Sequence, residues 1–462
     1  MSAIEREEFD LVIIGGGSAG LAAAKGALAA CGTGRADSGP PVQTLPSGSV
    51  GRSGGEAGRE LGGKQGSGGL MKILLLEKEE ALGGILLQCV HNGFGLHRYR
   101  EELTGPEYAL RAAGEIDGAP IGVRLGAMAL KITPDLEVHY SGAKYGYRAA
   151  AAKAVVCATG CDERARGAIR IPGDRPSGVM TAGLAQHYMN LDGFTVGRRV
   201  FILGSGDIGL IMARRVTLEG GTVLGVAELM PYSNGLARNV VQCLDDFGIP
   251  LYLSHTVKRI VGKERLEKVV IARVDEKFEF VPGTEKEFDA DTLLLSVGLT
   301  PSVRLLAELG VKLHPKTGGP LVDEMFQTSV PGVFACGNGL HVHDLADSVS
   351  SEGEIAGAAA ARFVRRQREP GGPGNAVRTE PGNGIAYLLP SFLHPDRAGE
   401  FQLKFRVSRP FRDVSLLLKL NGEPVKKTRK PYLLPAEMES LRVTRDELPA
   451  SEGILSLEVS DE

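Results

Sequence analysis

Two glycine-rich loops have the residue types and spacing that bind a pyrophosphate. One spans residues 15–20 and the other 204–209, and each follows a short apolar run, 10–14 and 200–203. In such a loop the first glycine permits a tight turn, the second lets backbone N–H groups approach phosphate, and the third packs a helix against the strand. The helix start adds partial positive charge. The residues expected to contact cofactor are Gly15, Gly17, Ser18, Ala19 and Gly20, and then Gly204, Gly206, Asp207, Ile208 and Gly209.

Each loop needs an acidic residue at the end of its next strand, where a carboxylate accepts hydrogen bonds from a ribose. Glu77 follows the run 72–76, and Glu228 follows the run 222–227. A carboxylate at Glu228 favours NAD because it repels a 2′-phosphate. Arg238, just downstream, leaves NADP open as the alternative. Two loops with two acidic partners predict two dinucleotides side by side, and hence electron transfer between them.

The pattern of expected strands and helices along the chain predicts an α/β fold. It has two Rossmann-like dinucleotide-binding domains and a small C-terminal β-sandwich-like domain. We expect the first domain over 1–165 and 290–368, the second over 166–289, a linker over 369–383 and a β-rich domain over 384–462. Period-2 alternation in 401–407, 414–420 and 454–459, with Asn421-Gly422 as a turn, indicates the sandwich. Residues 32–69 are rich in Gly, Ser and Pro, which predicts a surface insertion, with a partner-binding loop as the alternative.

Bulk composition excludes several classes of function. The chain has 462 residues, of which 43% are hydrophobic and 24% charged, and its formal net charge is −3. A nearly neutral chain does not favour nucleic acid as a partner. No apolar run approaches the roughly eighteen residues of a membrane span. A cytoplasmic protein without a membrane span is the expectation.

Cysteine and histidine spacing predicts no metal site. The six cysteines include only one close pair, Cys157 and Cys161, and no C-x-x-C. This pattern fits neither a disulfide scaffold nor a zinc or iron–sulfur motif. His341 and His343 lie on one side of an extended segment, and Asp344 or Asp347 is the available third ligand. A solvated loop is the favoured interpretation there.

Several motifs in a fixed order resemble the two-dinucleotide-binding-domain flavoproteins of the pyridine nucleotide–disulfide oxidoreductase superfamily. They are the two glycine loops with Glu77, Leu82-Gly83-Gly84, Ala158-Thr159-Gly160, and the segment 328–338 ending in Cys336-Gly337-Asn338. The resemblance covers about residues 9–366 and implies FAD at the first loop and NAD(P) at the second. It adds Gly84, Ala158, Thr159, Gly160, Gly298, Gly337 and Asn338 as cofactor-binding residues. Asn338 stands where the family usually has Asp, and the helix from Ser351 would point at the flavin.

A closer likeness lies in residues 84–95, 101–108 and 203–210. These segments resemble the flavoprotein associated with bacterial glycerol-3-phosphate dehydrogenase and the flavin subunits of opine dehydrogenases and hydrogen cyanide synthase. Those relatives act in complexes, which implies a partner redox subunit such as a dehydrogenase. Cys89 and His91, in the loop after Gly84, are the candidate catalytic residues. For Cys89 a buried, small hydrophobic side chain is the favoured interpretation, and for His91 a turn cap is an equal alternative.

The sequence therefore predicts an FAD-dependent oxidoreductase that transfers hydride between NAD(P)H and flavin. Electrons would reach an unidentified acceptor or partner subunit without a redox-active cysteine pair, because the superfamily's dithiol motifs are missing. One alternative is the flavin subunit of a glycerol-3-phosphate, opine or amino-acid type dehydrogenase complex. Another is a non-catalytic scaffold whose C-terminal sandwich docks partners.

Overall fold

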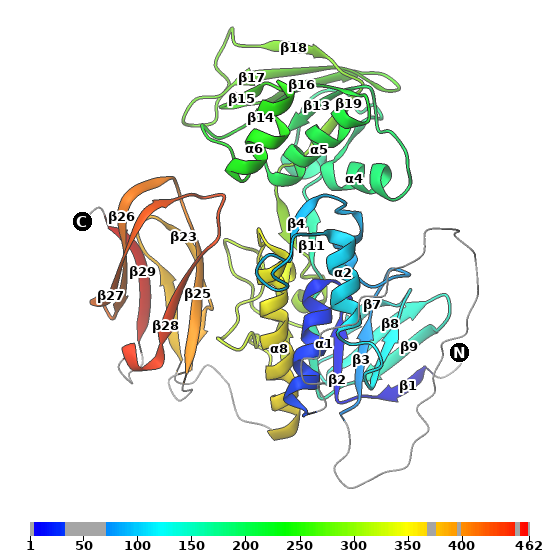
Figure 1. Ribbon diagram of the computed structural model, residues 1–462, viewed down its shortest axis with the longest axis vertical. Coiled ribbons are helices and arrows are strands. Elements are labelled where there is room, and N and C mark those ends of the chain that lie inside the picture. The colour runs from blue at the N-terminus through cyan, green and yellow to red at the C-terminus, as the bar shows by residue number, and fades with distance from the viewer. Residues whose placement is uncertain (1–3, 33–70, 367–375, 395–398, 449–452, 461–462) are drawn as a thin grey trace.

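The computed structural model describes residues 4–32, 71–366, 376–394, 399–448 and 453–460. In these ranges the chain forms two Rossmann-like units and a C-terminal β-sandwich (Figure 1). The predicted α/β fold class is confirmed. The insertion expected over 32–69 lies outside the described residues, except for Gly32.

The first Rossmann unit is built on a five-stranded parallel sheet. Its order is β21-β10-β2-β3-β6, and strands β21, β10, β2 and β3 are buried along their whole length because both faces are covered. A four-stranded sheet, β1-β9-β8-β7, packs on one face through a shared apolar cluster. The bounds are β21 (Val333–Ala335), β10 (Ala154–Cys157), β2 (Leu11–Ile14), β3 (Ile73–Leu76), β6 (Ile121–Arg124), β1 (Glu5–Glu8), β9 (Gly146–Ala151), β8 (Glu137–Gly142) and β7 (Met128–Ile132).

Three helices, α1 (Ser18–Ala30), α2 (Gly105–Gly114) and α8 (Ala346–Arg366), cover the other face of this sheet (Figure 1). Helices α1 and α8 approach closely because glycines lie at their contact. A Cβ on Gly357 would lie 1.9 Å from the Ala23 carbonyl oxygen, and one on Gly353 would lie 2.2 Å from that of Ala19. The two helix starts therefore lie together at the carboxyl edge of the sheet. Helix α8 begins at Ala346, earlier than the start at Ser351 that the sequence suggested.

The second Rossmann unit repeats this plan. Its parallel sheet has the order β12-β19-β13-β14-β15, with helices packed on one face and the antiparallel sheet β16-β17-β18 on the other. The bounds are β12 (Val179–Thr181), β19 (Thr292–Leu295), β13 (Arg199–Leu203), β14 (Thr222–Glu228), β15 (Leu251–Leu253), β16 (His255–Gly262), β17 (Leu266–Arg273), β18 (Lys286–Asp289), α4 (Ala182–Asn190), α5 (Asp207–Leu218) and α6 (Ala237–Cys243).

Short elements join the two units and shape the space between them. Strands β11 (Cys161–Glu163) and β20 (Leu299–Pro301) pair antiparallel and carry the chain between the units. The remaining elements are η1 (Gly84–Gln88), β4 (Asn92–Phe94), β5 (Leu103–Thr104), α3 (Arg166–Ile169), η2 (Asp245–Phe247), α7 (Arg304–Glu308) and η3 (Gly337–Gly339). No helix in the described ranges combines the length and apolar character that a bilayer crossing requires.

The C-terminal part is a sandwich of two sheets, β24-β22-β29-β26-β27 and β23-β25-β28, around one apolar core. Its bounds are β22 (Val377–Pro381), β23 (Ile385–Leu389), β24 (Phe392–Leu393), β25 (Glu400–Val407), β26 (Phe411–Leu420), β27 (Glu423–Leu433), β28 (Glu439–Thr444), η5 (Arg445–Glu447) and β29 (Ile454–Ser460). The three alternating segments are strands, and Asn421 (φ 52°) and Gly422 (φ 89°) form the expected turn. The linker expected over 369–383 is wrong in part, because Val377–Pro381 pairs with β29 as strand β22.

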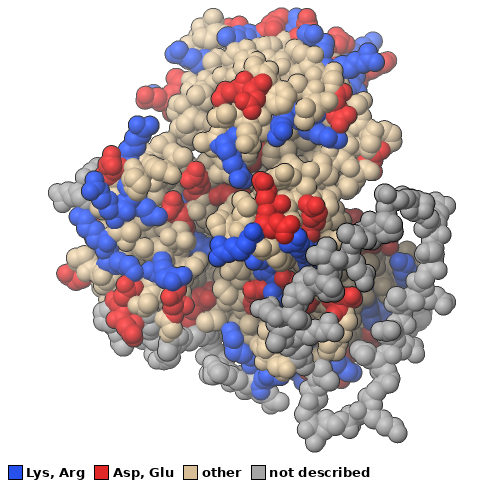
Figure 2. All heavy atoms as spheres, in the orientation of Figure 1, with Lys and Arg blue, Asp and Glu red and all other residues tan. Residues whose placement is uncertain are grey.

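Strand β27 forms an edge of the larger sheet and carries many cations. Lysines and arginines gather over the sandwich on the face shown in Figure 2. Lys426 and Lys430 each pair with a glutamate, Glu447 and Glu439 respectively. Charges along an edge strand oppose the addition of another strand, so they account for this basic face without a ligand.

Candidate functional site

The first glycine loop is held by the carboxylate that follows strand β3. Glu77 is 4% exposed; its Oε2 accepts the Gly16 N–H at 2.6 Å and its Oε1 accepts the Glu79 N–H at 2.8 Å. A carboxylate oxygen has two lone pairs, so both oxygens can accept a further bond from a ribose hydroxyl. In this structure the hydrogen bond from Gly16 lets Glu77 fix the backbone of the first glycine loop.

The second loop is built by the same device. Glu228, also 4% exposed, accepts the Ser205 N–H at 2.9 Å, the Ser205 hydroxyl at 2.6 Å and the Met230 N–H at 2.9 Å. Asp207 opens helix α5, but its Oδ1 accepts the Leu236 N–H and the Asn239 amide. Its carboxylate therefore holds the start of helix α6, whereas the sequence suggested a cofactor contact.

The space around the glycines tests whether a dinucleotide fits the first loop. A Cβ on Gly15 (φ 106°) would lie 2.3 Å from the Ala158 carbonyl, and one on Gly20 would lie 1.7 Å from the Gly15 carbonyl. A Cβ on Gly17 would find nothing closer than Gly84 Cα, at 3.9 Å. Gly15 and Gly20 are thus required by the fold, whereas Gly17 leaves open space. Helix α1 starts there without a side-chain cap and without an acidic residue in its first turn, which suits a phosphate.

One large cleft joins the two loops. Its volume is about 2510 Å³, and it runs from the first loop to the second between the two Rossmann-like units. The expected site residues that line it are Gly15, Gly17, Ser18, Ala19, Glu77, Gly84, Cys89, His91, Ala158, Thr159, Gly160, Gly204, Gly206, Asp207, Ile208, Glu228, Gly298 and Asn338. Gly20, Gly209 and Gly337 lie behind the lining, where the first two pack helices against strands.

The turn after strand β10, formed by Ala158, Thr159 and Gly160, lines one part of the cleft. The Ala158 N–H donates to the Ile14 carbonyl at 2.8 Å, which joins this turn to the end of β2. The Thr159 hydroxyl donates to the Ser302 carbonyl at 2.8 Å. Gly298 has φ 98°, a conformation that favours glycine. These contacts set the turn beside the first loop.

Cys89 and His91 both face the cleft, but their environments suit different chemistry. Burial raises the pKa of Cys89 to about 12, and its thiol donates to the Ile85 carbonyl, at 3.3 Å. Burial lowers the pKa of His91, which therefore stays neutral near pH 7. A neutral imidazole can accept or donate a hydrogen bond, whereas a protonated thiol is a poor nucleophile.

All six cysteines, each of which lies in a described range, are free thiols. Burial raises the pKa of Cys157 to about 12 and those of Cys161 and Cys243 to about 11. Cys157 and Cys161, the one close pair in the sequence, do not form a disulfide. Thiols held in their protonated form do not support a dithiol relay.

The turn at Gly337 and Asn338 differs from the expectation. The Gly337 N–H donates to Glu352 Oε2 at 3.1 Å, so it serves the protein's own carboxylate. Asn338 lines the cleft, and its Oδ1 accepts the His343 N–H at 3.0 Å. The Asn338 side chain thus fixes the loop that follows it, and Asn338 itself forms part of the cleft wall.

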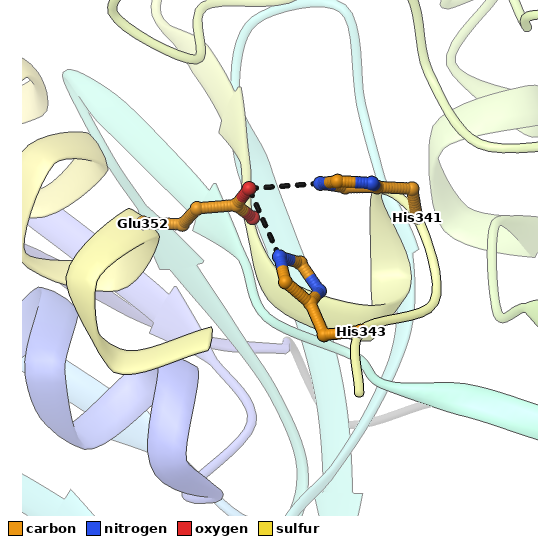
Figure 3. Close-up of side chains that lie close together, drawn as sticks. All are labelled: His341, His343 and Glu352. Atoms are coloured by element: carbon orange, nitrogen blue, oxygen red, sulfur yellow. Dashed lines mark hydrogen bonds and ion pairs between the residues drawn. The ribbon is translucent and has the colours of Figure 1, made fainter. Parts of the chain in front are cut away.

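His341 and His343 are buried, and the solvated loop expected for them is wrong. Each side chain is 1% exposed, and each Nε2 lies against Glu352 Oε1, at 2.8 Å and 3.0 Å (Figure 3). The carboxylate that joins them is neither Asp344 nor Asp347. Lys404 Nζ, from strand β25 of the sandwich, donates to the same oxygen at 2.8 Å. Sequence reasoning missed Glu352 and Lys404; an acid among the small residues of helix α8 was the available signal.

The three atoms of His341, His343 and Glu352 are close enough to hold a metal ion, since all lie within 4.8 Å of one another. Lys404, however, already places an ammonium group on the shared oxygen. A divalent ion beside that group would meet strong repulsion in a buried site. The cluster is therefore built around a lysine cation.

Hydrogen bonds also fix how the two Rossmann-like units face one another. The Gln88 amide donates to the Gly183 carbonyl and to Gln186 Oε1, both at 3.0 Å. The Asn190 amide donates back to the Gln88 carbonyl at 2.8 Å. Helix α4 of the second unit thus rests on the η1 turn beside Cys89.

Comparison with known proteins places the chain in a family. The model of the family described as pyridine nucleotide-disulphide oxidoreductase matches residues 9–363. An NADH oxidase from Methanocaldococcus jannaschii is 31% identical over 153 residues, 32% of this chain and 31% of that protein. An NAD(P)H sulfur oxidoreductase (CoA-dependent) from Pyrococcus abyssi is 30% identical over 168 residues, 35% of each chain. The chain thus aligns with about a third of the length of these curated relatives.

Solved structures resemble the fold over a longer stretch. Thioredoxin reductase from T. acidophilum has a TM-score of 0.57 and 22% identity, covering 77% of this chain and 98% of its own. Bacillithiol disulfide reductase Bdr from Bacillus cereus has a TM-score of 0.56 and 16% identity, covering 78% of this chain and 100% of its own. At these identities the likeness concerns the fold. On the family match over most of its length, the chain belongs to the pyridine nucleotide-disulphide oxidoreductase family.

Proposed function

We propose that this chain is an FAD-dependent oxidoreductase that transfers hydride between NAD(P)H and FAD, with NAD preferred. FAD is assigned to residues 1–165 and 290–368, and NAD(P) to residues 166–289. The observation that carries the proposal is that both glycine loops open onto one cleft, each braced by its own buried carboxylate. Relatives named NADH oxidase and NAD(P)H sulfur oxidoreductase support the same class of activity.

When bound, FAD supplies a ring that exchanges hydride with a nicotinamide. The chain's own residues bind and orient the two dinucleotides. The start of α1 and the open space at Gly17 receive one pyrophosphate, and the start of α5 at Gly206 receives the other. Helix α8 directs its positive end toward the cleft and stabilises negative charge there. His91 is neutral near pH 7 and donates its Nδ1–H to the Asn92 carbonyl at 3.0 Å, so its Nε2 can accept a hydrogen bond in the cleft.

The preference for NAD rests on Glu228. Its carboxylate is buried at the end of β14, where it opposes a 2′-phosphate. Arg214 and Arg238 also line the cleft, so NADP is the outcome that would contradict this preference. The glycerol-3-phosphate, opine or amino-acid dehydrogenase association and the partner redox subunit remain predictions from the sequence resemblance.

The test combines binding with coenzyme choice. Apoprotein is titrated with FAD, and the loaded protein is then mixed with NADH or NADPH while flavin absorbance is followed. We expect one FAD per chain and a rate constant with NADH at least ~10-fold above that with NADPH, about 1.4 kcal/mol in transition-state binding. A chain that binds no FAD contradicts the proposal, and faster reduction by NADPH contradicts the coenzyme preference.

A further inference from the structure

Two cations of the C-terminal sandwich reach into the first Rossmann-like unit. In strand β25 the residues Leu403, Phe405 and Val407 are buried in the sandwich core. Lys404 and Arg406 alternate with them and therefore lie on the opposite face of the strand. That face rests on the first unit, where the side chain of Lys404 is 13% exposed and that of Arg406 is 18% exposed.

Lys404 holds the loop at residues 338–344 through one carboxylate. Its Nζ binds Glu352 Oε1, which also contacts His341 and His343, while Glu352 Oε2 accepts the Gly337 N–H. His343 in turn donates its N–H to Asn338 Oδ1. A continuous chain of contacts thus runs from the sandwich to Asn338 at the cleft wall.

Arg406 holds the other end of the same loop. Its guanidinium donates to the Val342 carbonyl at 3.3 Å and forms an ion pair with Asp344. Asp344 Oδ2 accepts the Met438 N–H at 2.6 Å, which ties the loop to the sandwich a second time. Val342, His343, Asp344 and Arg406 all line the cleft. The sandwich therefore contributes to the cleft wall itself.

The charges of this cluster depend on Lys404. Burial opposes ionisation of Glu352, yet His343, His341 and Lys404 hold its pKa well below the usual range. Burial lowers the pKa of His341 to about 4, so that ring is neutral near pH 7. Tyr387 on β23 and Cys336 before η3 also face the carboxylate, and burial raises the pKa of each. A buried anion without a cation is strongly unfavourable, and Lys404 is one of the three groups that lower the pKa of Glu352.

We propose that Lys404 is a positioning residue of the FAD site, which makes the C-terminal sandwich part of that site. Acting through Glu352, it fixes the 338–344 loop and with it Asn338. This inference rests on the proposed FAD binding. It gives the sandwich a role inside the chain, in contrast to a scaffold that only docks partners.

The test uses the full chain with four changes. Lys404→Met removes the charge and keeps the length, Lys404→Arg restores the charge, and Glu352→Gln removes the carboxylate through which Lys404 acts. Lys419→Met is the matched control, because Lys419 pairs with Glu458 within the sandwich, in strands β26 and β29. FAD affinity of each apoprotein is measured between pH 5 and 8, together with the melting temperature and the metal content.

We expect Lys404→Met to weaken FAD binding ~10-fold or more, Lys404→Arg to recover most of the loss, and Lys419→Met to bind as the wild type does. Lys404→Met should also change the pH dependence of FAD affinity, because Glu352 would lose one of the groups that lower its pKa. In the Glu352→Gln background Lys404→Met should change FAD affinity no further. That comparison also decides the matter if Lys404→Met alone does not fold, because the double variant carries no unpaired buried charge.

Three results would overturn the inference. One is wild-type FAD affinity and pH profile in Lys404→Met. Another is that Lys404→Met lowers FAD affinity by the same factor in the wild type and in the Glu352→Gln variant. The third is a stoichiometric metal ion in the wild type that is lost in Glu352→Gln, because a metal would then hold the carboxylate. A wild-type chain that binds no FAD overturns the proposed function and this inference together, whereas normal wild-type binding with any of the three overturns the inference alone.

Discussion

The backbone N–H of Gly16 donates to the Glu77 carboxylate at 2.6 Å, and this contact joins the first glycine loop to the end of strand β3. Ser205 and Glu228 repeat the relationship in the second loop, at 2.9 Å. Each carboxylate also accepts the N–H two residues further on, from Glu79 or Met230. The same kind of hydrogen bond thus fixes both loops, and each carboxylate can be replaced separately.

Glu77→Gln and Glu228→Gln should affect different cofactors. A glutamine has only one acceptor oxygen, so one backbone N–H at the loop faces an NH₂ group and loses its bond, at a cost of about 1–3 kcal/mol. We expect Glu77→Gln to weaken FAD binding and leave the NADH dependence of the loaded protein unchanged. Glu228→Gln should raise the KM for NADH with FAD affinity intact. Titration of FAD and steady-state kinetics check both, and loss of FAD from Glu228→Gln would contradict the assignment.

Gly17→Ala separates an effect on FAD binding from an effect on the stability of the fold. The nearest atom to its new Cβ is 3.9 Å away, so the apoprotein should keep its melting temperature. With pyrophosphate bound the methyl group occupies the space that the ligand needs, and we expect FAD affinity to fall at least ~10-fold, about 1.4 kcal/mol.

The matched control for Gly17→Ala is Gly114→Ala at the end of α2, where a Cβ meets nothing within 4 Å. Alanine is the better helix former by roughly 0.5–1 kcal/mol, so this variant should bind FAD normally and be no less stable. Undiminished FAD affinity in Gly17→Ala would show that the first loop does not hold the pyrophosphate.

Cys89→Ser should leave flavin reduction by NADH within about threefold of the wild type, less than 1 kcal/mol in the barrier. The Cys89 thiol is buried with its pKa raised to about 12, and a serine hydroxyl can donate to the same Ile85 carbonyl. Stopped-flow absorbance under anaerobic conditions measures the rate. A loss of a hundredfold would instead make the thiol part of the chemistry.

Stability should fall as the pH drops from 6.5 towards 4 because of His341. Its pKa is about 4 in the folded protein against 6.5 in the unfolded chain, so the unfolded chain binds the extra proton in this window. The stabilisation is complete above pH 6.5 and is lost towards pH 4, on the order of 3 kcal/mol in all. Glu352, whose folded pKa is also lowered, keeps its own contribution above about pH 4.5 and loses it only as the pH falls further.

Urea unfolding at several pH values measures this slope. His341→Gln keeps a donor toward Glu352 but cannot titrate, so it should flatten the profile between pH 4 and 6.5. His187→Gln, at a side chain that is 45% exposed, serves as the control and should keep the wild-type profile. An unchanged slope in His341→Gln would mean that other groups cause the acid sensitivity.

The sequence predicted those features that depend on local spacing. Gly15, Gly20 and Gly204 lie where a Cβ would strike backbone, so their positions follow from the turn alone. The sandwich strands were recognisable because side chains alternate with a period of two, and Asn421-Gly422 marked the turn between β26 and β27.

The cluster at Glu352 could not be predicted in this way. Lys404 lies 52 residues from Glu352 in the chain, and only the docking of the sandwich on α8 brings them together. Alternation in residues 401–407 identifies the two faces of β25 but not the surface that covers the polar one. The sequence offers Asp344 and Asp347 as the nearest acids to His341 and His343, whereas the carboxylate that contacts both is Glu352, inside helix α8.

An anaerobic titration of the FAD-loaded protein with NADH tests the central claim most directly. Because the six cysteines are free and their thiols are protonated, the flavin is the one two-electron centre that the account assigns to the chain. We predict that one equivalent of NADH bleaches the flavin absorbance completely and that further NADH is not consumed. Flavin that stays oxidised with excess NADH would contradict the account, and uptake of a second equivalent would reveal a redox centre that the account denies.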